Sequence, residues 1–169
     1  MFGFFKKRSE TPKPSPVKPP VDLNKPVENP RLVAAIFAFA QSRTPATQEA
    51  LTHALRTANF LVPILTDEMH STPSGDNGQM TIQAGSRIKI ITCFDDAGGN
   101  HLALFTDWPS IRRWTEQPVS TLVMPAAEAF GFASSDQHAG AVVNPGDNAL
   151  PLDKKLLAYL LNESEHTNA

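Results

Sequence analysis

The chain has 169 residues, of which 41% are hydrophobic and 19% are charged. This apolar content is enough for a hydrophobic core and argues against a wholly disordered chain. The net charge of −2 excludes the strong positive field of a typical nucleic-acid binder, and the single cysteine excludes an internal disulfide and a thiolate zinc site.

The N-terminal region differs from the rest in its proline content and charge. Seven of the fifteen prolines lie between residues 12 and 30, and residues 1–26 hold six basic but only two acidic side chains. Each proline fixes φ and removes a backbone donor, which prevents a helix or a central strand. We therefore predict a disordered, basic, Pro-rich tail over residues 1–28, one folded domain over 29–163 and a short C-terminal tail over 164–169.

The first residues of this tail combine aromatic side chains with a basic triplet, namely Phe2, Phe4, Phe5, Lys6, Lys7 and Arg8. Such a segment can rest weakly on an anionic membrane surface. The alternative is a tail without a function. The longest apolar run, residues 32–40, is too short to cross a bilayer, so we expect a protein that is soluble or at most peripheral to a membrane.

Two short helices are expected at the start of the domain. Asn29-Pro30 and Thr44-Pro45 each combine a capping residue with a proline in the first turn. Apolar residues recur at helical spacing after both. Two helices joined by so few residues predict an αα-hairpin.

The period then changes to that of strands. The apolar run over residues 60–65 predicts a strand, and Pro63 within it favours an edge or a bulge. Proline and glycine residues predict a loop over residues 71–79. Three further strands are expected, over residues 80–84, 87–94 and 101–105, and turn-forming residues between the last two indicate a hairpin.

The rest of the chain alternates between helices and strands. Asp107 is expected to cap a helix with Trp108 and Ile111 on its apolar face, and Asp153 to cap the last helix. Between them we expect strands over residues 120–124 and 139–143 and a short helix after the first of these. The predicted class is α+β: a mixed, largely antiparallel sheet with helices packed against it, preceded by the αα-hairpin.

No familiar catalytic, phosphate-binding or metal-binding motif is present, and the five histidines lack ligand spacing, so we expect no metal, no cofactor and no assigned catalytic residue. Cys93 lies in a predicted strand, which is more typical of a small buried hydrophobe than of a nucleophile. Asp95 and Asp96 are a possible carboxylate pair for hydrolysis, although aspartates in turns usually bind the backbone.

Polar and basic residues near two predicted turns are the candidates for binding, namely Thr106, Asp107, Arg112, Arg113, Asn144 and Asp147. Each has a structural alternative. Asp107 is interpreted first as a helix cap. The turn that begins at Asn144 can bind an anion through backbone N–H groups or simply reverse the chain. The arginine pair can contact an acidic partner or lie on a solvated helix face.

Four stretches together resemble a known family: residues 55–63, residues 88–94, Leu104-Phe105-Thr106-Asp107-Trp108, and Val142-Val143-Asn144-Pro145-Gly146. They are similar to the N-terminal domain of the SseB family of bacterial proteins, over about residues 31–162. The resemblance implies a bacterial cytoplasmic α+β protein. It implies no activity, because the family offers no established catalytic residues to transfer.

We therefore expect a non-enzymatic protein-interaction or regulatory module, cytoplasmic or peripheral to the inner membrane, whose partner is another protein and not a nucleic acid. One alternative is a small-molecule-sensing domain with a pocket near Asp107 and Asn144, and another is a hydrolase that uses aspartates at strand ends. An exposed apolar patch would favour the interaction module. Convergent carboxylates with raised pKa values in a pocket would favour the hydrolase.

Overall fold

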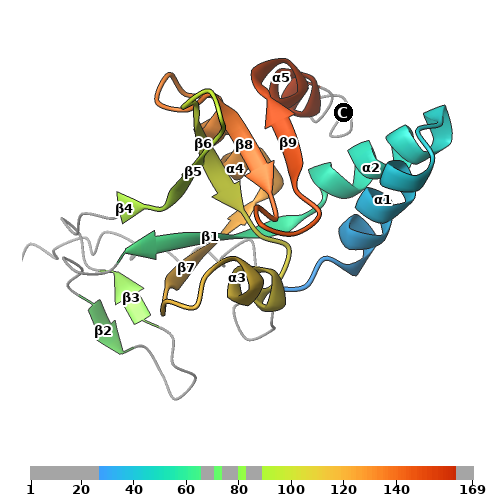
Figure 1. Cartoon of the computed structure of the whole chain (residues 1–169). Coiled ribbons are helices and arrows are strands. Elements are labelled where there is room, and N and C mark those ends of the chain that lie inside the picture. Colours follow the sequence, from blue (N-terminus) through green and yellow to red (C-terminus); the bar gives the residue numbers. More distant parts are fainter. Residues whose placement is uncertain (1–26, 66–70, 74–79, 83–88, 163–169) are drawn as a thin grey trace, which may run out of the picture.

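A computed structural model of the chain describes residues 27–65, 71–73, 80–82 and 89–162. The predicted N-terminal tail, except for residues 27 and 28, and the whole of the predicted C-terminal tail lie outside the described residues. Five helices and three small sheets make up the described part (Figure 1). The class is α+β, as the sequence predicts.

The N-terminal αα-hairpin consists of α1 (Pro30–Gln41) and α2 (Pro45–Arg56). Thr44 caps α2 as expected, since its hydroxyl accepts a hydrogen bond from the Thr47 N–H at 3.2 Å. Asn29 does not cap α1 with its side chain, so that prediction is wrong. Its amide instead donates to the carbonyl oxygens of Asn59 and Thr106, both at 2.8 Å, and fastens the start of α1 to the sheet.

The first sheet places β1 (Asn59–Leu65) between β4 (Lys89–Ile90) and β7 (Ser120–Pro125), antiparallel to both. The prediction that Pro63 marks an edge is therefore wrong. The Pro63 carbonyl accepts from the Ile91 N–H, and Leu61 pairs with Phe105 on the same side of β1. Pro63 would point its missing N–H to this side, between the contacts to Phe105 and Ile91. The pairing of β1 with β7 on the other side is therefore left intact.

The second sheet has the order β5-β6-β8-β9, formed by β5 (Thr92–Phe94), β6 (Asn100–Leu104), β8 (Gly140–Val143) and β9 (Leu150–Asp153). The pairing of β6 with β8 is parallel and the other two pairings are antiparallel. The strand predicted over residues 87–94 is split in two at Ile91, because its first part pairs with β1 and its second part with β6.

Two strands differ from the sequence prediction. Residues 71–73 form β2 (Ser71–Pro73), paired with β3 (Met80–Ile82), so the loop predicted over residues 71–79 is wrong for its first three residues. β9 was not predicted at all, because its short sequence contains Pro151. A proline is compatible with β9 because this strand lies at the edge of its sheet.

The remaining helices are α3 (Trp108–Trp114), α4 (Ala126–Ala133) and α5 (Lys154–Asn162), and Asp153 caps α5 as expected. The main core lies among the sheets, the αα-hairpin, α4 and α5, and includes the tilted ring pair Phe60–Phe130 at 5.8 Å. A second cluster of Leu61, Ala103, Phe105 and Ile111 packs α3 and Val27 against the sheets. Among the described residues, no helix is both long and apolar enough to cross a membrane.

Candidate functional site

The strand-to-helix corner after β6 is held by a buried hydrogen-bond network. Asn144, which follows β8, accepts from the Thr106 N–H through Oδ1 at 3.0 Å and donates from Nδ2 to the Thr106 hydroxyl at 3.0 Å. Thr106 is fully buried and Asn144 nearly so. The Asn144 side chain, 38 positions further along the chain, thus provides a hydrogen-bond partner for the Thr106 N–H just after β6.

The conformation of the Asn144 turn explains the Asn-Pro-Gly sequence. Asn144 has φ of 51°, a left-handed value that asparagine tolerates better than other residues with a Cβ. Gly146 has φ of 86°, and a Cβ on it would lie 3.1 Å from the Trp114 ring. The positive φ values and the nearby Trp114 ring therefore account for asparagine and glycine at these two positions.

Asp107 caps α3, as the sequence predicts. Its Oδ1 accepts from the Ser110 N–H at 2.8 Å, and its Oδ2 accepts from the Thr106 hydroxyl at 2.8 Å. Burial by itself raises the pKa of the Asp107 carboxyl, but the hydrogen bonds from Ser110 and Thr106 outweigh it and the pKa is lowered. The positive charge of Arg113 contributes to this lowering. The carboxylate therefore stays ionised near neutral pH.

The structure brings five of the six candidate residues together and leaves one apart. Asp147 accepts from Nε of Arg113 at 2.8 Å, and the terminal nitrogen of Arg113 also lies 2.7 Å from that carboxylate. This pair closes the same corner next to Asp107. Arg112 lies on the exposed face of α3 and makes no ion pair with another described residue. The polar corner formed by Thr106, Asp107, Arg113, Asn144 and Asp147 thus uses its charged and hydrogen-bonding groups largely on itself.

The hollow inside this polar corner is small. It has a volume of about 50 Å³ and is bordered by Asp107, Asn144 and Asp147 together with side chains of α1. Sites for small molecules typically have about 300–1,000 Å³. The hollow between Asp107 and Asn144 is therefore too small for such a ligand, and a small-molecule pocket elsewhere near Asp107 stays a prediction.

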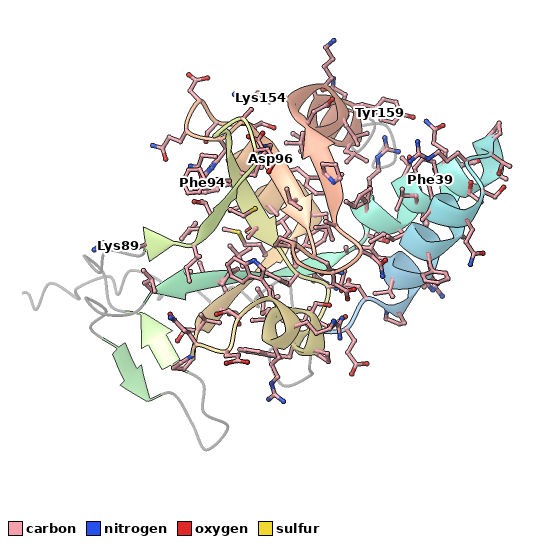
Figure 2. All side chains as sticks on the ribbon, viewed as in Figure 1. Phe39, Lys89, Phe94, Asp96, Lys154 and Tyr159 are labelled. Atoms are coloured by element: carbon pink, nitrogen blue, oxygen red, sulfur yellow. The ribbon has the colours of Figure 1, made fainter. Side chains whose placement is uncertain are left out.

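The carboxylates of the β5–β6 hairpin are not gathered in a catalytic arrangement. Asp95 accepts from the backbone N–H groups of Ala97 and Gly99 and lies 2.9 Å from Nε2 of His101. The contact with His101 lowers the pKa of Asp95, whereas a catalytic acid needs a raised one. Asp96 is exposed at the tip, and Figure 2 shows it well away from the αα-hairpin.

Cys93, in the same hairpin, is half-buried, and burial raises the pKa of its thiol. A raised pKa reduces the thiolate fraction and with it the reactivity of the sulfur. Among the described residues, no three histidine, cysteine, aspartate or glutamate side chains are placed to hold a metal ion.

An apolar groove lies next to the polar corner, and we call it the α1 groove. It has a volume of about 750 Å³ and lies between the outer face of α1 and the start of α3. Its walls include three exposed large hydrophobic side chains: Val33, Phe37 and Trp108 are 42%, 56% and 39% exposed. Residues 27–30, which lie next to α3 and lead into α1, form another part of the wall (Figure 1).

The charge at the α1 groove has one sign. Glu28 and Asp107 are acidic, and none of the described residues that line the groove is basic. The ordered network around Asp107 fixes one of these charges at the end of the groove beside Trp108. The groove therefore combines apolar walls with a negative border.

Sequence reasoning missed this groove, although a signal for it is present. Residues 32–40 are apolar on every face of α1, yet only Leu32, Ala35 and Ile36 are buried in the core. A helix that is hydrophobic all round is usually covered on all sides. The unburied face of α1 is the face that lines the groove.

The fold and the groove define a small α+β domain with an exposed apolar groove beside a polar corner. The model of the SseB protein N-terminal domain matches residues 32–158, and the chain belongs to this family. No curated protein and no solved structure matched the chain.

Proposed function

We propose that this domain is a protein-interaction module that binds an apolar, basic segment of a partner protein in the α1 groove. The observation that carries the proposal is the clustering of Val33, Phe37 and Trp108 on one groove. Exposed hydrophobic residues that occur singly need no explanation, whereas a contiguous group beside a concave surface is typical of binding sites.

The chemistry of the partner follows from the border of the groove. A side chain that leaves the apolar walls meets Glu28 or Asp107, and a lysine or arginine there gains an ion pair in a partly dehydrated place. An acidic partner would be repelled by the same groups. The face of α1 is straight and spans three turns, which fits a helix or an extended peptide with apolar residues along one side.

The polar corner has a supporting role in this proposal. Thr106 and Asn144 fix the position of Asp107, and Arg113 with Asp147 closes the adjoining end. These residues hold the charged border in place, and only Asp107 among them lines the groove itself.

The test is selection of binders from a displayed library of random dodecapeptides against the full chain. We expect enriched peptides to combine aromatic or aliphatic residues with at least one lysine or arginine. Binding should be lost when Val33→Gln and Phe37→Gln are introduced together, since glutamine keeps the helix propensity but removes the apolar surface.

The matched control is Phe94→Gln. Phe94 is 71% exposed and lies at the β5–β6 hairpin, apart from α1 (Figure 2). Enriched peptides that bind equally well to the Val33→Gln, Phe37→Gln double variant, or that are predominantly acidic, would refute the proposed site.

A further inference from the structure

The α1 groove has chemistry that a segment of this same chain matches. Its walls are apolar, its border carries Glu28 and Asp107, and none of the described residues that line it is basic. Residues 2–8 hold three phenylalanines followed directly by two lysines and an arginine. The aromatic part fits the walls and the basic part fits the border.

The connection between this segment and the groove is favourable in position and in length. Val27 and Glu28, where the described chain begins, are themselves part of the groove wall. Residues 9–26 separate them from the aromatic and basic segment. A tether of about 18 residues spans roughly 55 Å when fully extended at about 3.1 Å per residue, which is ample for the segment to return to the groove.

The tether also raises the local concentration of the segment. The covalent linker makes this contact intramolecular, with an effective concentration that the length and stiffness of the linker set. Even a weak contact between the segment and the groove is then populated. A partner with the same chemistry has to displace it.

We propose that residues 2–8 dock in the α1 groove of their own chain and act as a competing, autoinhibitory occupant. Phe2, Phe4 and Phe5 cover the apolar walls, and the basic triplet faces Glu28 and Asp107. The regulatory consequence rests on the proposed function of the groove. The docking itself does not depend on any partner.

Disulfide trapping tests the docking directly in the full chain. The native thiol is first removed by Cys93→Ser, and one cysteine is placed in the tail by Phe4→Cys. The second is placed in the groove by Ala38→Cys, which leaves the apolar walls intact because Ala38 is an exposed lining residue. The control pair combines Phe4→Cys with Glu49→Cys, an exposed position on the neighbouring helix α2 outside the groove.

We expect the groove pair to form an intramolecular disulfide at least about tenfold faster than the control pair, at a rate independent of protein concentration. Equal rates for the two pairs would overturn the proposal. Crosslinks that appear only between two chains would also overturn it and would assign the groove to a second copy. Equal rates together with tail-dependent co-sedimentation with anionic lipid vesicles would assign the segment to a membrane surface instead.

A second measurement separates this proposal from the proposed function. The full chain with Phe2→Ser, Phe4→Ser and Phe5→Ser should bind a library-selected groove peptide at least about tenfold more tightly than the unchanged chain does. Trapping without any groove peptide selected against either the unchanged chain or the triple serine variant would support the docking and refute the partner site. A selected groove peptide whose affinity the triple variant leaves unchanged would refute the autoinhibition and leave the partner site standing.

Discussion

Replacement of Asn144 by alanine tests how far the polar corner depends on one side chain. In the native chain the Asn144 amide satisfies both the backbone N–H and the hydroxyl of Thr106, a residue with no exposed surface. Alanine removes both contacts and leaves the Thr106 N–H without a partner in a place that water does not reach. It also puts an ordinary residue at a left-handed φ of 51°.

The expected cost is the sum of these two effects. A buried donor without a partner costs about 1–3 kcal/mol. The left-handed conformation costs a residue such as alanine roughly 1–2 kcal/mol. We therefore expect Asn144→Ala to lower the free energy of unfolding by about 2–5 kcal/mol, a large part of the stability of a domain of this size.

Asn144→Gly is the matched control, because glycine loses the same hydrogen bonds but adopts the positive φ freely. Its loss of stability should be smaller than that of alanine by about 1 kcal/mol. The measurement is urea unfolding of the full chain followed by circular dichroism, with the slope of the transition checked for constancy. A loss below about 0.5 kcal/mol for Asn144→Ala would refute the structural role of this side chain.

Four other predictions concern the stability of the protein. Asp107→Ala should cost about 1 kcal/mol of unfolding free energy, whereas Asp107→Asn should be nearly neutral because asparagine also caps helices well; a reversed order in urea unfolding would contradict the cap. The pKa of Asp107 is lower in the folded than in the unfolded chain. The ionised carboxylate therefore stabilises the fold above the unfolded-state pKa, and this stabilisation is lost as pH falls through the folded-state pKa. Asp107→Asn should accordingly show a flatter decline of stability below about pH 4. Burial lowers the pKa of His138, so the unfolded chain takes up a proton first and stability falls as pH drops below about 6.5. His138→Leu should remove this part of the pH dependence in melting curves recorded below about pH 6.5. A chain that starts at Val27 should melt within a few degrees of the full chain, whereas one that starts at Asn29 should melt lower because Val27 packs on the second core cluster; equal melting of the two shortened chains would contradict this packing.

Local signals in the sequence predicted most of the elements correctly. The αα-hairpin, the caps at Thr44, Asp107 and Asp153, and the succession of strands followed from residue types that act over a few positions. These features depend on nearest neighbours along the chain. The α+β class could therefore be predicted without knowledge of the pairing between strands.

The errors arose where distant parts of the chain decide the outcome. Pro63 is tolerated in a middle strand because the neighbour on one side of β1 changes there from Phe105 to Ile91. No local sequence pattern reveals this change. Asn29 carries a typical capping sequence, but its side-chain oxygen accepts from the Asn59 N–H, and its amide nitrogen donates to the carbonyl oxygens of Asn59 and Thr106. Tertiary contacts outweighed the local preference at both positions.

The candidate site shows the same division. Sequence reasoning selected residues that the fold gathers at one corner, yet it could not show that Asn144 and Thr106 bind each other across the β6–β8 pairing. The helical spacing of apolar residues predicted α1 but not which of these residues stay exposed. Only the packing shows that Val33 and Phe37 stay exposed and border the groove.

The affinity of one library-selected dodecapeptide for two single variants tests the central claim most directly. Isothermal titration with the full chain should give a dissociation constant at least about tenfold higher for Phe37→Gln than for the unchanged chain, since truncation of a hot-spot anchor costs about 2 kcal/mol or more and about 1.4 kcal/mol is already tenfold. Phe94→Gln should leave the dissociation constant within about twofold of the unchanged chain, since a surface residue outside the interface adds little to affinity. An equal loss of affinity in both variants, or none in Phe37→Gln, would contradict the assignment of the α1 groove as the binding site.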